Sequence, residues 1–351
     1  MDDRDIDVLW ETAAREFVVD DGAVDGILAD RQGTRVACGA GATVLTSGGF
    51  EYNKDLRLNF LEGPGVEGWA FYGTSANTGT GIEMAMEIGA GLSKVSKAAS
   101  WMIAAIPVRE HGLKIGLRTL VVGRPNTIVV DNFGERYAAE RTITKDPSRY
   151  LFYKEGVRFD VEELLYPRMP SWLVFDETLR KRRSVVSLRG TGYQGIEWGE
   201  ENGHAIENGW ILRAPTIEEL AREISDHPEN RELMDADALL ETVSKYNCCC
   251  EVSKTDPFGS EPENMAPLRS PPYYALPLYP GGPNTKGGIL ANGDREALNT
   301  EREPIPNLYT AGEISSAFKF VYQGGNLAEC IAFGRIAGEN AAERALSVSR
   351  R

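Results

Sequence analysis

The sequence is poor in the residues that build metal and nucleic-acid sites. Of its 351 residues only three are histidines, and His111, His204 and His227 are scattered along the chain. His227 lies in a polar turn, so we expect it at the surface. The net charge of −14 disfavours nucleic acid as a partner, because such binding needs clustered Lys and Arg. We therefore predict neither a metal ion nor a nucleic-acid partner.

Cysteines and long apolar runs are also scarce. Three of the five cysteines are consecutive, at 248–250, and neighbours of this kind match neither a disulfide framework nor a metal-ligand spacing. We interpret them as reduced thiols at the end of a helix. No apolar run approaches the roughly 20 residues that span a bilayer, and no signal peptide is recognisable. The sequence therefore predicts a cytoplasmic protein without a transmembrane segment.

The first 50 residues show a strand pattern. Alternating apolar runs, separated by turns at 21–22 and 31–33, predict a small antiparallel meander. Residues 42–46 are more continuously apolar, as a buried parallel strand would be. Ser47, Gly48 and Gly49 follow, and the glycines let a ligand approach the backbone closely.

The end of the chain is typical of a segment that holds a cofactor. Residues 306–313 predict a short buried strand, and residues 322–338 predict a loop, a glycine pair and a long helix. Asn326 is a plausible N-cap, so the first N–H groups of the helix would point at an electron-rich ligand atom. Gly334 and Gly338 lie four residues apart on one face, which predicts close packing on a sheet.

The middle of the chain alternates strand and helix signals. Residues 73–90 predict a glycine-rich loop that feeds a helix, and residues 126–140 predict a strand, a turn and a second strand. Residues 171–181 predict an apolar strand that ends in an Asp-capped helix. Thr216 and Glu219 form a capping box, and another helix is expected at 236–247.

Several of these motifs resemble one family. Ala-Gly-Glu at 311–313, Gly-Gly-Asn at 324–326 and Phe-Gly-Arg-Ile-Ala-Gly at 333–338 resemble the C-terminal segment of the FAD-dependent oxidoreductase 2 family. This family includes the fumarate reductase/succinate dehydrogenase flavoproteins and the 3-ketosteroid dehydrogenases. Residues 130–140 resemble its Val-Asn-x-x-Gly-x-Arg-Phe-x-Asn-Glu pattern. Thr80 stands where the family usually has Asp.

The resemblance implies a mixed α/β fold in two parts. A partial, Rossmann-like FAD-binding domain is expected at 1–95 and 286–351, with an inserted α+β substrate-capping domain at 96–285. The family's N-terminal βαβ unit, which carries Gly-x-Gly-x-x-Gly for the FAD pyrophosphate, has no counterpart in this sequence. We therefore expect a truncated member, or one of a pair of chains that completes the FAD site together.

The family also implies which residues contact FAD. The helix N-terminus faces the flavin pyrimidine ring, the acidic residue after Ala-Gly holds the FAD chain, and the 78–81 loop contacts the flavin from the other side. The residues assigned in this way are Ser47, Gly48, Gly49, Thr78, Gly79, Gly81, Gly288, Gly312, Glu313, Gly325, Asn326 and Leu327.

The substrate positions differ from those of the fumarate-reducing branch. Its first clamp histidine falls near Trp101, its His-Thr-x-Gly-Gly motif is replaced by a sequence that begins Asn284-Thr285, and Tyr322 replaces an arginine. The arginine that acts as its acid falls at Thr144 or Lys145, and Arg141 or Tyr150 could serve instead. The predicted catalytic residues are therefore Tyr322, Lys145, Arg141, Asn284 and Thr285, with a structural turn role nearly as plausible for Asn284 and Thr285.

Loss of the carboxylate clamp favours a neutral substrate, because a buried dianion needs positive partners. A tyrosine at the Tyr322 position resembles the ketosteroid dehydrogenase branch, where it hydrogen-bonds the ketone oxygen. We expect an enzyme that dehydrogenates or reduces a C–C bond next to a carbonyl, on an apolar enone or steroid-like ketone, with an external electron acceptor or donor. The alternatives are a fumarate- or urocanate-reducing enzyme, and a chain that does not bind FAD alone.

Overall fold

The computed structural model describes residues 6–63, 65–98, 101–141, 148–189, 195–317 and 325–348. The chain divides into two compact units. Unit 1 comprises Met1–Leu56, Asn77–Lys97 and Thr285–Arg351, and unit 2 comprises Arg57–Ala76 and Ala98–Asn284. The domain boundaries expected after residues 95 and 285 stay a prediction; in this division into units, residues 57–76 belong to unit 2.

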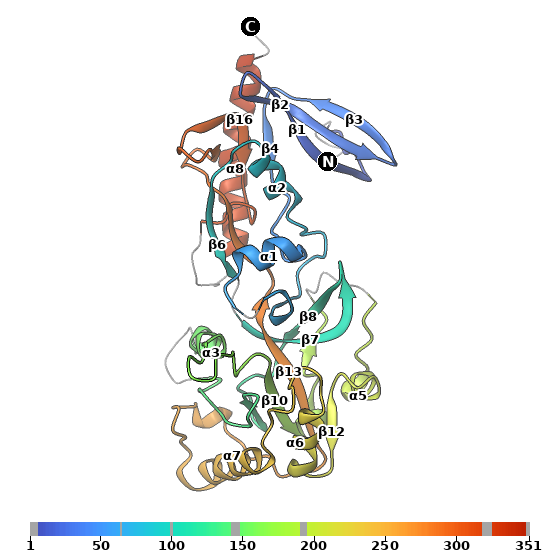
Figure 1. The fold of residues 1–351 in the computed structure, drawn as a ribbon, viewed down its shortest axis with the longest axis vertical. Coiled ribbons are helices and arrows are strands. Elements are labelled where there is room, and N and C mark those ends of the chain that lie inside the picture. Colours follow the sequence, from blue (N-terminus) through green and yellow to red (C-terminus); the bar gives the residue numbers. More distant parts are fainter. Residues whose placement is uncertain are drawn as a thin grey trace. The chain divides into compact units, whose positions relative to one another are not determined.

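Within its described residues, unit 1 contains three small sheets and the helices α2 and α8 (Figure 1). The predicted meander is confirmed as an antiparallel sheet of β1 (Thr12–Asp20), β2 (Ala23–Arg31) and β3 (Thr34–Gly39). The predicted parallel strand is confirmed as β4 (Thr43–Leu45), which pairs with β16 (Pro304–Thr310). The other elements are β15 (Glu296–Leu298) beside β16, the pair β6 (Leu92–Ala98) and β14 (Thr285–Ile289), and the helices α2 (Thr80–Glu87) and α8 (Gly325–Val348).

Helix α8 packs on β16 through small residues, although not the predicted ones. Ala337 and Ala341 are buried against Tyr309. A Cβ added at Gly334 or Gly338 would meet nothing within 4 Å, so the prediction that these glycines allow close packing on a sheet is wrong. The alanines on the neighbouring face of the helix provide the close contact instead.

Unit 2 is built around one mixed sheet. Its strands are β5 (Ala70–Phe71), β7 (Trp101–Glu110), β8 (Leu113–Thr119), β9 (Thr127–Val130), β10 (Ser171–Asp176), β11 (Val186–Ser187), β12 (Leu212–Ala214) and β13 (Tyr273–Gly282). Strand β13 lies centrally: it is antiparallel to β10, β7 and β12 and parallel to β5. Strand β10 is buried along its whole length, as its continuous apolar sequence predicts.

Four helices of the described residues pack with this sheet: α3 (Ser148–Gly156), α4 (Glu177–Arg182), α6 (Ile217–Ser225) and α7 (Ala236–Cys248). Helix α5 (Gly203–Glu207) contacts the turn at Glu200–Asn202, and α1 (Lys54–Phe60) contains residues assigned to both units. Short helical turns occur at Val66–Gly68, Glu200–Asn202, Cys249–Ser253 and Pro262–Asn264. Helices α6 and α7 lie beside β10, β12 and β13 (Figure 1). Their apolar residues form one buried cluster with Trp172, Val174 and Ala275 of the sheet.

Local capping signals are confirmed in unit 2. The Asp176 carboxylate accepts hydrogen bonds from the backbone N–H groups of Thr178 and Leu179 at the start of α4. The Thr216 hydroxyl accepts from the Glu219 N–H at the start of α6. Both caps satisfy N–H groups that the helix itself leaves without partners.

Three local predictions are wrong. Residues 135–140 do not form a second strand, because Arg136 is drawn into ion pairs described below. Helix α8 begins at Gly325, so Asn326 lies in its first turn and is not the N-cap. His227 is half-buried, and its ring meets the edge of Trp172 at a centroid distance of 5.1 Å.

Two other kinds of site are not found among the described residues. None of the described helices combines the length and the apolar character that a membrane crossing requires. Within the same described ranges, no three His, Cys, Asp or Glu side chains are grouped in a way that would hold a metal ion.

Candidate functional site

The loop that follows β4 packs against distant segments of unit 1. A Cβ added at Gly49 would overlap the Thr285 hydroxyl and the Glu313 carboxylate, and it would lie 2.9 Å from Glu51 Oε1. The backbone N–H and the hydroxyl of Thr285 both donate to the fully buried Glu51 carboxylate, and the hydroxyl also accepts from the Phe50 N–H at 3.1 Å. Thr285 therefore ties β14 to this loop, which is a structural use of a hydroxyl that the sequence nominates for catalysis.

The segment before α2 packs against the same residues. We call the loops at 47–51 and 77–81, together with Thr285 and Glu313, the wall of unit 1. A Cβ at Gly48 would overlap the Asn77 amide, and Asn77 Nδ2 lies 3.5 Å from Glu313 Oε2. A Cβ at Gly81 would overlap the Ser47 hydroxyl. Glycine is needed at these positions because the backbones approach too closely for a side chain. The structure thus brings together residues from four segments that are far apart in sequence.

A buried lysine lies beside the first turn of α8. Lys286 is fully buried, and its Nζ donates to Asn326 Oδ1 at 3.0 Å. Burial lowers the pKa of Lys286, and the carboxylates of Glu329 and Glu313 act in the opposite direction. Glu329 in turn accepts from the Ser316 hydroxyl at 2.7 Å. This corner of unit 1 therefore combines a buried amine with the N-terminal turn of a helix, which favours negative charge.

The other residues assigned to FAD lie around this wall. The Thr78 hydroxyl lies 3.0 Å from that of Thr80, and the Gly79 N–H donates to the Gly49 carbonyl at 3.0 Å. Gly288 forms an isolated antiparallel bridge with Ser315, which lies after β16. Gly312, in the same segment, has a left-handed backbone with a φ of 81°. Leu327 differs from the rest, since its side chain is 69% exposed.

Two of the nominated catalytic residues, Tyr322 and Lys145, lie outside the described residues, as does Thr144. Asn284 is buried at the end of unit 2, and Tyr150 lies in the first turn of α3. Arg141 is half-buried in unit 2, with its Nε 3.8 Å from Glu261 Oε2.

Arg141 lines a pocket of unit 2 that we call the arginine pocket. It encloses about 340 Å³ and is lined by Trp101, Met102, Arg118, Thr119, Leu120, Val122, Arg124, Glu140, Arg141 and Phe152. Its lining combines apolar side chains with three guanidinium groups, of which those of Arg118 and Arg124 belong to exposed residues. Trp101 falls near the sequence position of the family's first clamp histidine. The Arg118 guanidinium lies over its ring, 5.9 Å from the ring centroid.

The positive charge of this pocket is weakly compensated. Within the described residues neither Arg118 nor Arg124 has a carboxylate partner, and Arg141 has only the long contact with Glu261. Burial lowers the pKa of Arg124, and the positive charge of Arg141 lowers it further. In a chain with a net charge of −14, this arrangement favours an anionic group in the pocket.

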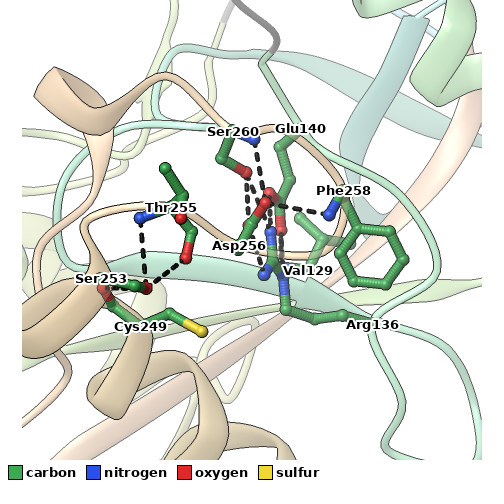
Figure 2. Close-up of polar contacts among 9 residues, drawn as sticks. All are labelled: Val129, Arg136, Glu140, Cys249, Ser253, Thr255, Asp256, Phe258 and Ser260. Atoms are coloured by element: carbon green, nitrogen blue, oxygen red, sulfur yellow. Dashed lines mark hydrogen bonds and ion pairs between the residues drawn. The ribbon is translucent and has the colours of Figure 1, made fainter.

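Glu140, the one carboxylate in the pocket, is already engaged. It accepts from Arg136 Nη2 at 2.8 Å and from the Val129 N–H at 2.8 Å (Figure 2). Arg136 Nη1 also contacts Asp256 Oδ2 at 2.8 Å, and the side chains of all three ionic partners are less than a tenth exposed. Burial acts to lower the pKa of Arg136, but the two carboxylates outweigh it and raise that pKa.

The sequence did not single out several residues of these sites. Glu51 and Asn77 carried no signal of their own, because their partners come from distant segments. Lys286 stood inside the Asn-Thr-x-Gly-Gly motif, and its place two residues before Gly288 could have drawn attention to it. Arg118 and Arg124 are separated by a strand end and a turn, so only the folded chain reveals them as neighbours in one pocket.

Comparison with known proteins agrees with this architecture. A solved 3-ketosteroid Δ1-dehydrogenase of Sterolibacterium denitrificans, in complex with 1,4-androstadiene-3,17-dione, superposes with a TM-score of 0.71 at 26% identity. The alignment covers 95% of this chain and 59% of that one. The predicted mixed α/β, FAD-binding fold is therefore confirmed.

The relatives found by sequence are also named as dehydrogenases and reductases. A 3-oxosteroid 1-dehydrogenase of Mycolicibacterium smegmatis is 26% identical over 359 residues, which cover 95% of this chain and 58% of the relative. A probable fumarate reductase of Shewanella frigidimarina is 29% identical over 312 residues, which cover 88% of this chain and 45% of the relative. This chain thus spans roughly half the length of the relatives that it matches.

A family model described as FAD binding domain matches residues 1–327, which is most of the chain. The match agrees with the predicted cofactor, FAD. Together with the glycine-built wall of unit 1, it establishes that the chain belongs to the FAD-binding-domain family.

Proposed function

We propose that this chain forms the flavin-facing wall and the substrate-binding unit of an FAD-dependent oxidoreductase that acts on a C–C bond next to a carbonyl. The observation that carries the proposal is the convergence in unit 1 of the loops at Ser47–Gly49 and Thr78–Gly81 with Glu313 and the first turn of α8. These are the segments that the family uses for FAD, and here they meet.

The donors and acceptors of this wall fit the chemistry of FAD. The buried Lys286 amine and the first turn of α8 present positive charge, which suits the electron-rich pyrimidine carbonyls of a flavin. The Glu313 carboxylate is an acceptor suited to the hydroxyls of the FAD chain. Glycine backbones at 48, 49 and 81 allow a flat ring to approach closely.

When bound, FAD supplies the hydride chemistry. The protein must then polarise the substrate carbonyl and move one proton at the neighbouring carbon. Arg141 and Lys145 remain our candidates for the proton transfer, and Tyr322 for the hydrogen bond to a ketone oxygen. Buried Lys286 would stabilise negative charge that develops on the ring, because opposite charges attract strongly where water is excluded.

Two substrate classes follow from different observations. Relatives named for 3-oxosteroids and 3-ketosteroids support an apolar ketone, and the arginine pocket has the apolar lining residues Trp101, Met102 and Phe152 to contact it. The three arginines of the pocket favour the second class, an enoate whose carboxylate they would pair with. An electron donor or acceptor outside the chain is needed in either case.

Titration of the purified chain with FAD, followed by flavin fluorescence, tests the cofactor proposal. We expect saturable but readily dialysed binding, because the sequence lacks a pyrophosphate fingerprint. Lys286→Met should weaken binding about tenfold, whereas Arg31→Met, which removes an exposed cation on β2 of the same unit, should leave it unchanged. Absence of binding would favour a chain that needs a partner, and binding that Lys286→Met does not alter would contradict the proposed wall.

A dye-coupled assay that compares a 3-ketosteroid with succinate tests the substrate class. If the substrate is an enoate, Arg124→Gln and Arg118→Gln should each reduce turnover of succinate about tenfold, the effect of losing one charge-assisted hydrogen bond. Turnover confined to the ketosteroid, and unaffected by both substitutions, would leave the ketone as the substrate class.

A further inference from the structure

A second cavity of unit 2 lies beside helix α7, and its place and character differ from those of the arginine pocket. It encloses about 510 Å³, within the range of small-molecule sites. Its walls come from α7, from the loop around Asp256 and from the segment that begins at Glu135. We call it the α7 cavity. Neither the proposed reaction nor the family resemblance assigns it a role.

Aromatic rings and carboxylates form the walls of this cavity. The rings of Tyr246 and Phe258 lie 5.0 and 5.2 Å from the Arg136 guanidinium, so this wall already holds one cation against two aromatic rings. Figure 2 shows Arg136 together with Phe258 and Asp256 at this wall.

The residues in and behind the walls of the α7 cavity carry more negative than positive charge. Glu135, Glu241 and Asp256 line it, against the cations Arg136 and Lys245, and Glu140 lies directly behind Arg136. Glu241 pairs with Lys245 at 2.7 Å, whereas Glu135 has no ion-pair partner among the described residues. The four carboxylates and two cations leave a local excess of negative charge, which disfavours an anionic occupant and attracts a cationic one.

We propose that the α7 cavity binds a small molecule that joins an apolar, ring-sized body to a protonated amine. The body would lie on the Tyr246 and Phe258 side, and the ammonium group would lie near the carboxylates of Glu135 and Asp256. Of these two carboxylates, Glu135 is exposed and would make the direct contact. Asp256 is already engaged by Arg136 and by the N–H and hydroxyl of Ser260, so it would contribute only a fixed negative charge in the wall. A site of this kind relies on cation–π attraction and charge together.

Isothermal titration of the purified 351-residue chain distinguishes this site from a non-specific apolar pocket. The probes are 2-phenylethylammonium, its neutral isostere 2-phenylethanol and the anion 3-phenylpropionate. We expect the amine to bind at least tenfold more tightly than the alcohol, and the anion not to bind in this cavity. Equal affinity for amine and alcohol would overturn the proposal.

Substitutions locate the binding. Thr242→Trp fills the cavity and should abolish binding of the amine, whereas Ser244→Trp, on the same helix but outside the cavity, should leave affinity within twofold. Glu135→Gln should reduce the advantage of the amine over the alcohol several-fold. Unchanged binding by the Thr242→Trp variant would place the amine elsewhere and would contradict the proposal.

A thiol footprint tests the site in the wild-type chain, so the result does not depend on the folding of a variant. Cys249 lines the cavity, whereas Cys38 lies in unit 1 on β3. Saturating 2-phenylethylammonium should slow alkylation of Cys249 by N-ethylmaleimide at least threefold, with alkylation of Cys38 unchanged, as measured by peptide mass spectrometry. An unchanged rate at Cys249 would count against occupation of the cavity.

Discussion

The candidate sites of the two units are built in different ways. The wall of unit 1 consists of backbone segments that approach each other at glycines, and Gly49 has no room for a Cβ. The arginine pocket of unit 2 consists of long charged side chains, and the buried ion pairs of Arg136 support one side of it. A backbone wall tolerates no added atom, whereas a pocket of this kind is sensitive to the loss of a single charge.

The largest expected effect follows from removing Arg136. Arg136→Met leaves Glu140 and Asp256 as buried carboxylates without their common cation, which costs about 3–5 kcal/mol in comparable buried pairs. Denaturant unfolding should report this loss, and hydrogen exchange should place it in peptides covering 127–141 and 254–261. The exposed ion pair of Arg35 with Glu16 provides a matched control, since Arg35→Met should cost less than about 1 kcal/mol. Equal effects of the two substitutions would contradict the role given to the buried network.

Unit 2 also carries a pH-sensitive group, Asp131, which precedes the turn that leads to Arg136. Burial raises its pKa to about 6, and the N–H groups of Glu135 and Phe133 that bond to it act in the opposite direction. Because this folded-state pKa lies above the unfolded value of about 3.9, the native state binds more protons between these values. The contribution of Asp131 to stability should therefore decline as pH rises from about 4 to 6, by on the order of 2–3 kcal/mol.

Asp131→Asn tests this assignment, because the amide keeps an acceptor oxygen but does not ionise. The free energy of unfolding at pH 7 should rise, and its decline between pH 4 and 6 should become smaller. Asp20→Asn, a change at an exposed residue of unit 1, is the control and should leave the pH profile nearly unaltered. A profile that Asp131→Asn leaves unchanged would assign the decline to other groups.

Gly49→Ala tests the wall of unit 1, where backbone segments meet at glycines. The added Cβ would overlap Thr285 and Glu313 and should cost about 1–3 kcal/mol, as overpacking of a well-packed region does. Affinity for FAD should fall with it, whereas hydrogen exchange in β10 and β13 should not change. Gly293→Ala, where a Cβ meets nothing within 4 Å, is the control. If both variants bind FAD equally well, the backbone wall does not form the site.

Local patterns predicted elements in both units where the decisive contacts are short-range. The meander, the β4 strand and the glycine loops follow from short-range spacing, and so do the caps at Asp176 and Thr216. The strand predicted after Gly134 fails for a long-range reason: Arg136 bonds Asp256, which lies 120 residues further along the chain. No periodicity within residues 126–140 contains that partner.

Contacts between distant segments also explain why predictions failed at single residues. His227 belongs to a polar turn by its neighbours, yet Trp172 of a distant strand covers its ring. The arginine pocket gathers guanidinium groups from β8 and two separate loops, so its charge is invisible in a chain whose overall charge is negative. Sequence can identify where a backbone must be glycine, but ion pairs between distant segments become visible only in the fold.

The smallest expected effect concerns the helix glycines that were predicted to pack on a sheet. Gly334 and Gly338 lie in the interior of α8 and contact nothing that a Cβ would disturb. Replacing either with alanine should therefore stabilise the chain by about 0.5–1 kcal/mol, since glycine costs that much in an exposed helix interior. Thermal unfolding of the single and double variants measures the gain. A loss of stability would mean that another surface packs against this face of α8. The glycines of α8 would then be needed for close contact, as Gly49 is in the loop after β4.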